Sequence, residues 1–163
     1  QETTGANDVV ISTSAGQAVR FNEQDVRAMG RSAKGVRGIR LRPKDEIVGM
    51  DVIQDRGQKL LVVSANGYGK ATVAENLPVH KRGGVGIKVA AITAKTGPLV
   101  AVHTLDPAAK EVIMMSTKGQ AIRVAVKEIP TLGRATQGVR IMRLNDGDTV
   151  ASIGIVMPEA AGE

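Results

Sequence analysis

Residues 118–123 read K-G-Q-A-I-R, and the stretch that follows them has an arginine at position 134 and a glycine at position 138. Two earlier stretches have the same spacing, with an arginine 15 residues and a second glycine 19 residues after the first glycine. The matched sets are Gly16, Arg31 and Gly35, then Gly67, Arg82 and Gly86, then Gly119, Arg134 and Gly138. A period of about fifty residues indicates structural repeats that bury their apolar faces by stacking on one another.

Each repeat is predicted to contain four short strands, because runs rich in β-branched residues alternate with turns that contain glycine or charged residues. The expected strands are 9–12, 18–21, 36–41 and 47–52 in the first repeat, 60–63, 70–74, 86–91 and 98–103 in the second, and 111–115, 121–126, 139–144 and 150–156 in the third. The first two strands of each repeat form a hairpin, and Asn66-Gly67 is the strongest turn signal. The six matched glycines are assigned to turns.

The repeats, at about 8–54, 58–106 and 110–157, indicate an all-β fold of propeller-like blades. A helical solenoid needs apolar residues at helical spacing over ten or more positions, and no window of the chain provides this. Three four-stranded blades do not close a ring of the usual four to eight blades. We therefore expect the chain to be part of a larger disc and, since it does not begin with Met, a segment of a longer protein.

Composition excludes several classes of function. The chain has no cysteine, so disulfides and thiolate metal sites are excluded, which fits a reducing cytoplasm. Its two histidines, His80 and His103, lie 23 residues apart without paired carboxylates, so a metal centre is not predicted. There is no apolar run long enough to cross a membrane and no secretory signal at the start.

Basic residues are concentrated in the first repeat. The net charge of the chain is +6, and eight Lys or Arg lie between Arg20 and Lys44 against two acidic residues. A basic face of this density attracts polyanions, of which nucleic acid is the commonest, although a solvated face that keeps the protein soluble is the alternative. Arginines that recur at one position of successive blades predict a curved positive track for bent duplex DNA.

Aromatic content favours duplex DNA over single strands, because Phe21 and Tyr68 are the only aromatic residues available to stack on bases. Tyr68 is not a predicted nucleophile, since Gln17 and Gln120 occupy its position in the other repeats. The glycine-rich stretches lack the spacing of a phosphate-binding loop. The candidate DNA-binding residues are Arg20, Arg27, Arg31, Lys34, Arg37, Lys70, Lys81, Arg82, Lys88, Arg123, Lys127, Arg134 and Arg140.

The stretch 20–39, which reads R-F-N-E-Q-D-V-R-A-M-G-R-S-A-K-G-V-R-G-I, resembles the C-terminal domain of DNA gyrase A, as do 66–70 and 133–139. The resemblance covers nearly the whole chain. It implies a β-pinwheel, a disc of about six four-stranded blades whose edge wraps DNA, with this chain as the last three blades and 158–163 as the start of the C-terminal tail.

The resemblance also implies a parent enzyme, a type IIA topoisomerase that supercoils DNA in an assembly of two A and two B subunits, using ATP and magnesium, in the cytoplasm on the chromosome. Its catalytic residues and cofactors lie outside this chain, so the segment itself is expected to be non-catalytic and to hold no cofactor or metal. The partners that the resemblance implies are double-stranded DNA, the rest of gyrase A, and gyrase B. No association with a membrane is expected.

Two alternatives remain open. The family's wrapping motif reads Q-R-R-G-G-K-G, and residues 80–86, H-K-R-G-G-V-G, match it at four of seven positions and lie in a later repeat. The equivalent domain of the topoisomerase IV A-type subunit is therefore the first alternative. The second is a propeller-like scaffold for acidic protein partners.

Overall fold

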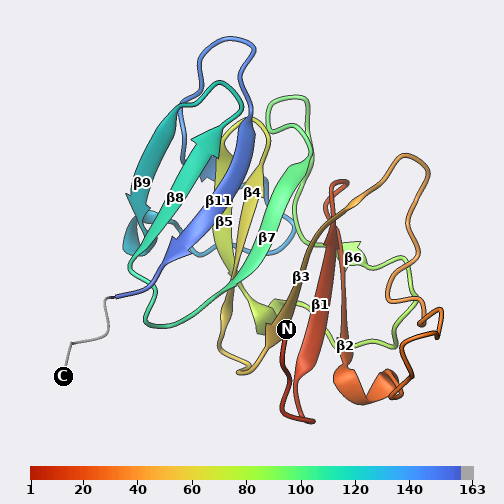
Figure 1. Cartoon of the computed structure of the whole chain (residues 1–163). Coiled ribbons are helices and arrows are strands. Elements are labelled where there is room, and N and C mark those ends of the chain that lie inside the picture. The colour runs from red at the N-terminus through yellow and green to blue at the C-terminus, as the bar shows by residue number, and fades with distance from the viewer. Residues whose placement is uncertain (159–163) are drawn as a thin grey trace.

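The computed structural model describes residues 1–158 and consists of three antiparallel sheets, or blades, arranged side by side (Figure 1). The expected tail at 158–163 lies outside the described residues except for its first one. Blade 1 contains β1 (Asp8–Thr13), β2 (Gln17–Asn22) and β3 (Ile47–Ile53), blade 2 contains β4 (Lys59–Ser64), β5 (Tyr68–Val73) and β7 (Leu99–Leu105), and blade 3 contains β8 (Glu111–Ser116), β9 (Ala121–Ala125) and β11 (Val150–Val156). The all-β, propeller-like class is confirmed.

The hairpins that open the repeats follow from their turn glycines. Gly16, Gly67 and Gly119 have φ values of 78°, 79° and 86°, a left-handed conformation that side chains disfavour. Each glycine N–H donates to the carbonyl three residues earlier, at 3.0 to 3.1 Å. The β-branched residues on either side then pair as β1–β2, β4–β5 and β8–β9.

The third strand of each repeat does not join its own blade, which corrects the sequence prediction. β6 (Ile87–Lys88), from the second repeat, pairs with β2 of blade 1, and β10 (Val139–Arg140), from the third repeat, pairs with β5 of blade 2. Both are shorter than predicted. Each is therefore a strand donated to the preceding blade.

The exchange leaves both ends of the row of blades incomplete among residues 1–158. The predicted strand at 36–41 is not formed, because no preceding sheet edge is present for it to join. Blade 3 has three strands, in the order β11-β8-β9, because no further repeat donates a strand to β9. The prediction of four strands in every blade is thus correct for the first two blades only.

A single turn of 3-10 helix follows the second strand of each repeat. These turns are η1 (Glu23–Asp25), η2 (Ala74–Asn76) and η3 (Val126–Glu128). After each one, a long connection leads to the region of the donated strand and then to the fourth strand. The fourth strands lie next to one another, since β7 contacts both β3 and β11.

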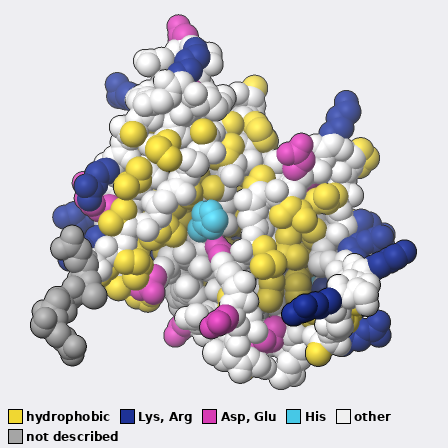
Figure 2. All heavy atoms as spheres, viewed as in Figure 1, with side chains coloured by type: hydrophobic (Ala, Val, Ile, Leu, Met, Phe, Trp, Pro, Cys, Tyr) yellow, Lys and Arg dark blue, Asp and Glu magenta, His cyan; other side chains and the backbone are white. Residues whose placement is uncertain are grey.

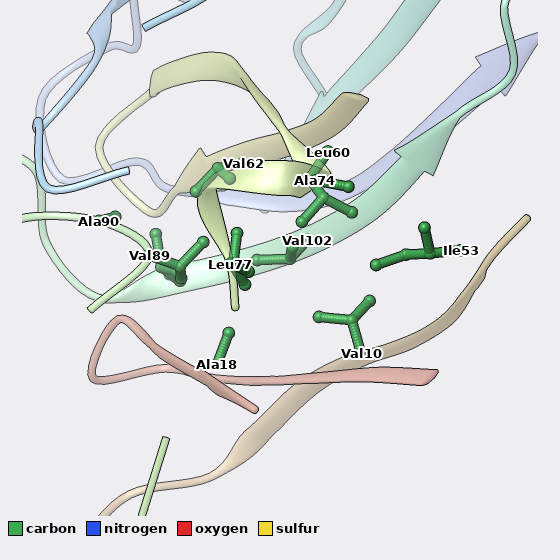
Figure 3. Packing of buried hydrophobic residues seen from close by; sticks show 11 residues of the cluster. Val10, Ala18, Ile53, Leu60, Val62, Ala74, Leu77, Val89, Ala90 and Val102 are labelled. Atoms are coloured by element: carbon green, nitrogen blue, oxygen red, sulfur yellow. The ribbon is translucent and has the colours of Figure 1, made fainter. Parts of the chain in front are cut away.

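The two larger core clusters lie between the blades. Val10, Ala18 and Ile53 of blade 1 pack against Leu60, Leu77 and other residues of the second repeat (Figure 3). Successive residues of β4 point to opposite faces, so Leu61 and Val63 instead pack against Val112 and Met114 of blade 3. Blade 2 is thus buried on both faces, and packing between repeats stabilises the row of blades.

Candidate nucleic-acid interface

The connection between β2 and β3 contains the densest basic surface of the chain. Its Lys and Arg residues are exposed, and Figure 2 shows basic side chains gathered at the right margin, over this connection. Hydrophobic side chains and a histidine lie towards the middle of that view. The predicted DNA-binding residues that are exposed are Arg27, Arg31, Lys34, Arg37, Lys81, Lys88, Arg123, Lys127 and Arg140.

Arg20 is not available to DNA, which corrects its assignment. It is 6% exposed and forms an ion pair with Asp8, in which Nη2 lies 2.8 Å from Oδ2. Its Nη1 donates to the carbonyl oxygens of Ala74 and Leu77, at 2.7 and 3.2 Å. These carbonyls belong to the second repeat, so Arg20 fastens blade 1 to the turn around η2.

Lys70 is also buried, at 1% exposed, and its assignment to DNA is corrected in the same way. Its Nζ donates to the carbonyls of Gly133, Arg134 and Thr136 at 2.8 to 2.9 Å. Burial lowers the pKa of Lys70 to about 8. The side chain fastens the connection of the third repeat onto blade 2.

The matched arginines act between repeats. Arg82 is half-buried, and its Nη1 donates to the carbonyl of Arg37 at 3.1 Å. Arg134 is half-buried too, and its Nη1 donates to the carbonyl of Lys88 at 3.0 Å. The two acceptors occupy equivalent positions, 21 residues after the first glycine of the preceding repeat. These arginines therefore brace one connection against the previous one.

Arg31, in the equivalent position of the first repeat, is exposed and makes no side-chain hydrogen bond within residues 1–158. Hydrogen bonding to backbone leaves only part of each guanidinium of Arg82 and Arg134 for a phosphate. The repeat spacing predicted all three arginines together on a DNA-facing rim, and the structure gives two of them a bracing role instead.

The exposed cations of the junctions recur at a different position of the repeat. Arg37, Lys88 and Arg140 lie 21 residues after the first glycine of their repeats, and all three are exposed. Lys88 lies on the donated strand β6 and Arg140 on the donated strand β10, both at the outer edge of a sheet. Each was a candidate residue, but the shared position was missed.

The candidate DNA-binding residues left out two exposed lysines that share a repeat position. Lys44 and Lys95 both lie 28 residues after the first glycine, in the turn before the fourth strand. Lys95 lies over the ring of Tyr68, 5.5 Å from the ring centroid. Both shared positions lie beyond the second glycine of the repeat. Extending the sequence comparison past that glycine would have revealed the lysines 28 residues, and the cations 21 residues, after the first glycine.

All six matched glycines have φ between 74° and 86°, as their assignment to turns requires. Four of them also lie against backbone of a neighbouring repeat. A Cβ on Gly138, for example, would lie 2.5 Å from the carbonyl oxygen of Gly69. Glycine thus lets the donated strand approach the preceding blade.

Other kinds of site find no support in the described part of the chain. Residues 1–158 contain no group of three or more His, Cys, Asp or Glu that could hold a metal ion. None of their helices has the length and apolarity needed to cross a membrane.

Comparison with known proteins agrees with this arrangement. A family model described as the DNA gyrase C-terminal domain, β-propeller, matches residues 7–54, 58–106 and 110–157. The chain belongs to this family. The resemblance seen in the sequence is confirmed.

Curated relatives of this gyrase C-terminal chain include DNA gyrase A proteins. The chain is 41% identical over 157 residues to that of Aminobacterium colombiense, covering 96% of the chain and 19% of the relative. It is 40% identical over 162 residues to that of Staphylococcus aureus, covering 99% of the chain and 18% of the relative. The chain thus spans about a fifth of the length of these relatives.

Solved structures give the same fold. A DNA gyrase A C-terminal domain matches with a TM-score of 0.85 and 26% identity, over 95% of this chain and 52% of that one. The C-terminal domain of a DNA topoisomerase IV matches with a TM-score of 0.87, over 95% of this chain and 48% of that one, but at 21% identity. The second likeness concerns the fold alone.

Proposed function

We propose that this chain is a non-catalytic module that binds and wraps double-stranded DNA within a gyrase-type topoisomerase. The observation that carries the proposal is the recurrence of exposed cations at equivalent outer positions of successive repeats, Arg37, Lys88 and Arg140, beside the basic connection of the first repeat. Such a row provides a positive charge at each junction for contact with a phosphate backbone.

The mechanism is electrostatic. Each Lys or Arg that neutralises a phosphate releases a bound counterion, and many such contacts offset the several kcal/mol needed to bend a short duplex. The bracing by Arg82, Arg134, Arg20 and Lys70 keeps the blades in fixed positions, so that the cations are held in place before DNA binds. Among the described residues, exposed cations can contact the phosphates of the DNA backbone, and there is no recognition helix to contact the bases. We therefore expect binding to be independent of base sequence.

The whole protein's role is proposed from the relatives. As a segment of gyrase A, the chain would work with the rest of that protein and with gyrase B, presenting wrapped DNA for ATP-dependent supercoiling on the chromosome in the cytoplasm. ATP and magnesium would bind elsewhere in that assembly. The coverage of about half of a solved gyrase domain fits three blades of about six.

The experiment is a titration of linear duplex with the chain at several salt concentrations. The logarithm of the affinity should fall steeply with the logarithm of the salt concentration, with a slope of about −0.9 for each phosphate neutralised. Replacing Arg37, Lys88 and Arg140 together by alanine should reduce the slope by about 2.7 in magnitude. Arg56→Ala is a control, because Arg56 is exposed and lies in the turn between β3 and β4.

A slope close to zero, or a triple variant that behaves like Arg56→Ala, would contradict the proposal. The topoisomerase IV alternative has support from the fold comparison, whereas 40% identity to gyrase A proteins favours gyrase. A scaffold for acidic proteins would bind acidic polypeptides with no preference for duplex.

A further inference from the structure

Tyr68 lies at the junction of blades 2 and 3, in contact with a donated strand. It begins β5, is 5% exposed and is the only tyrosine in the chain. It is paired directly across the sheet with Arg140 of β10. Arg140 Nη2 donates to the phenol oxygen of Tyr68 at 3.1 Å, and the guanidinium carbon lies 5.4 Å from the ring centroid.

A second cation contacts the same ring from a different part of the chain. Lys95 lies in the turn before β7, and its Nζ is 5.5 Å from the centroid of the Tyr68 ring. Tyr68 thus contacts one cation of the second repeat and one of the third. Cation–π attraction holds each charged group against the ring.

Neither cation is neutralised by a carboxylate among the described residues. The ion pairs found in residues 1–158 are Arg20 with Asp8, His103 with Asp51, and Arg123 with Glu111. Two like charges gathered on one aromatic side chain repel each other, and a bound anion relieves that repulsion. Burial raises the pKa of Tyr68, but hydrogen bonding and positive charge from Arg140 and Lys95 outweigh it and lower the pKa.

We propose that Lys95, Arg140 and the hydroxyl of Tyr68 form a phosphate-binding site at this junction, with Tyr68 as the residue that positions the two cations. The phenol oxygen accepts from Arg140, and its own proton has no acceptor among residues 1–158, so the hydroxyl can donate to a phosphate oxygen. In the whole module the phosphate belongs to the duplex backbone, and in this respect the inference rests on the proposed function.

The first junction contains a related arrangement. Gln17 is paired across the sheet with Lys88, as Tyr68 is with Arg140, and Lys44 occupies the position of Lys95. Glutamine has no aromatic ring to hold two cations. We therefore place the site at the second junction, where the ring of Tyr68 contacts both cations.

The test uses the chain with 3-fluorotyrosine, which gives one fluorine resonance because there is a single tyrosine. Duplex DNA should shift this resonance in the wild-type chain and in Arg56→Ala. Lys95→Ala and Arg140→Ala should each weaken duplex binding about five- to tenfold at low salt, because each removes a charge-assisted phosphate contact. Tyr68→Phe keeps the ring and removes the hydroxyl, so we expect a smaller loss, about threefold.

Inorganic phosphate serves as a second probe. If the resonance shifts with millimolar phosphate as well as with duplex, the site binds an isolated phosphate group. If it shifts with duplex alone, the site recognises a phosphate of the DNA backbone. Either result supports the proposed site. The inference is overturned if duplex binds with a steep salt dependence while the resonance stays fixed and Lys95→Ala matches Arg56→Ala. That result leaves the proposed function intact, whereas absence of duplex binding overturns both.

Discussion

At the scale of single residues, two arginines in the same position of the repeat have opposite environments. Arg20 and Arg123 both lie four residues after the first glycine, and both pair with an acidic residue on the neighbouring strand. Arg20 is 6% exposed and bonded to the next repeat, whereas the Arg123 side chain is 63% exposed. Position in the row of blades, and not the residue type, decides which arginine is structural.

The first prediction compares these two positions. Arg20→Met should lower the free energy of unfolding by about 3 kcal/mol or more, because it leaves Asp8 and two carbonyls of the second repeat without their partner. Arg123→Met should change it by less than about 1 kcal/mol, since exposed ion pairs contribute little. Urea denaturation of both variants measures the difference, and equal losses would show that Arg20 does not fasten the blades.

The second prediction concerns the pair formed by His103 of β7 and Asp51 of β3. His103 Nδ1 lies 3.1 Å from Asp51 Oδ2, which also accepts from the N–H of Thr104 at 2.9 Å. The hydrogen bond to Asp51 raises the pKa of His103, and burial only partly opposes this. Burial alone would raise the pKa of Asp51, but its hydrogen bonds, that from His103 foremost, lower it.

Because the pKa of His103 is raised on folding, its stabilising contribution is complete below its usual value of 6.5 and is lost as the pH rises through the raised value. Asp51 stays ionised throughout that window because its pKa is lowered from 3.8. The melting temperature of the wild type should therefore exceed that of His103→Gln at about pH 5, and the gap should narrow by about pH 9. A gap that widens with pH would contradict this assignment.

At the scale of elements, donated strands depend on glycine where the backbones of two repeats meet. Gly138 and Gly35 occupy the same position of their repeats and have φ of 83° and 74°. A Cβ on Gly138 would lie 2.5 Å from the carbonyl oxygen of Gly69, whereas a Cβ on Gly35 would meet nothing within 4 Å. An alanine at either position would be strained by the positive φ, but only at Gly138 would its Cβ also clash with a neighbouring repeat.

The third prediction follows from that difference. Gly35→Ala should destabilise the chain by about 1 kcal/mol, the strain of a left-handed alanine. Gly138→Ala should cost about 3 kcal/mol or more, because β10 must also move away from β5. Thermal unfolding of both variants tests this, and similar losses at the two positions would show that the close approach is not required.

The hairpins could be predicted from the sequence, whereas the exchange of strands could not. Turn glycines and β-branched runs act within about ten residues, so Gly67 and its neighbours determine the β4–β5 hairpin locally. Packing between repeats decides which strand β10 pairs with. The two residues of β10 do not themselves indicate whether it joins blade 2 or blade 3. For the same reason the sequence could not show that Lys70 turns inward, since its acceptors are carbonyls more than sixty residues away.

At the scale of the whole molecule, blade 2 shows what a complete blade requires. It receives a strand from the next repeat, is packed on both faces and is fastened by Lys70. Blade 3 has the same hairpin but no donated strand, so one edge of β9 is unpaired within residues 1–158. The stability of a repeat protein is a sum of repeat and junction contributions, so blade 3 should be the least stable.

The fourth prediction is that amide hydrogens of β9 exchange at least about tenfold faster than those of β5, its counterpart in blade 2. β5 lies between β4 and β10, while β9 is paired with β8 alone. Hydrogen exchange followed by mass spectrometry resolves the two hairpins, and β8, which lies between β9 and β11, serves as the protected reference within blade 3. Equal protection of β5 and β9 would contradict this prediction, because it would mean that the row of blades opens as one cooperative unit. Packing between repeats would then be enough to stabilise blade 3 without a donated strand.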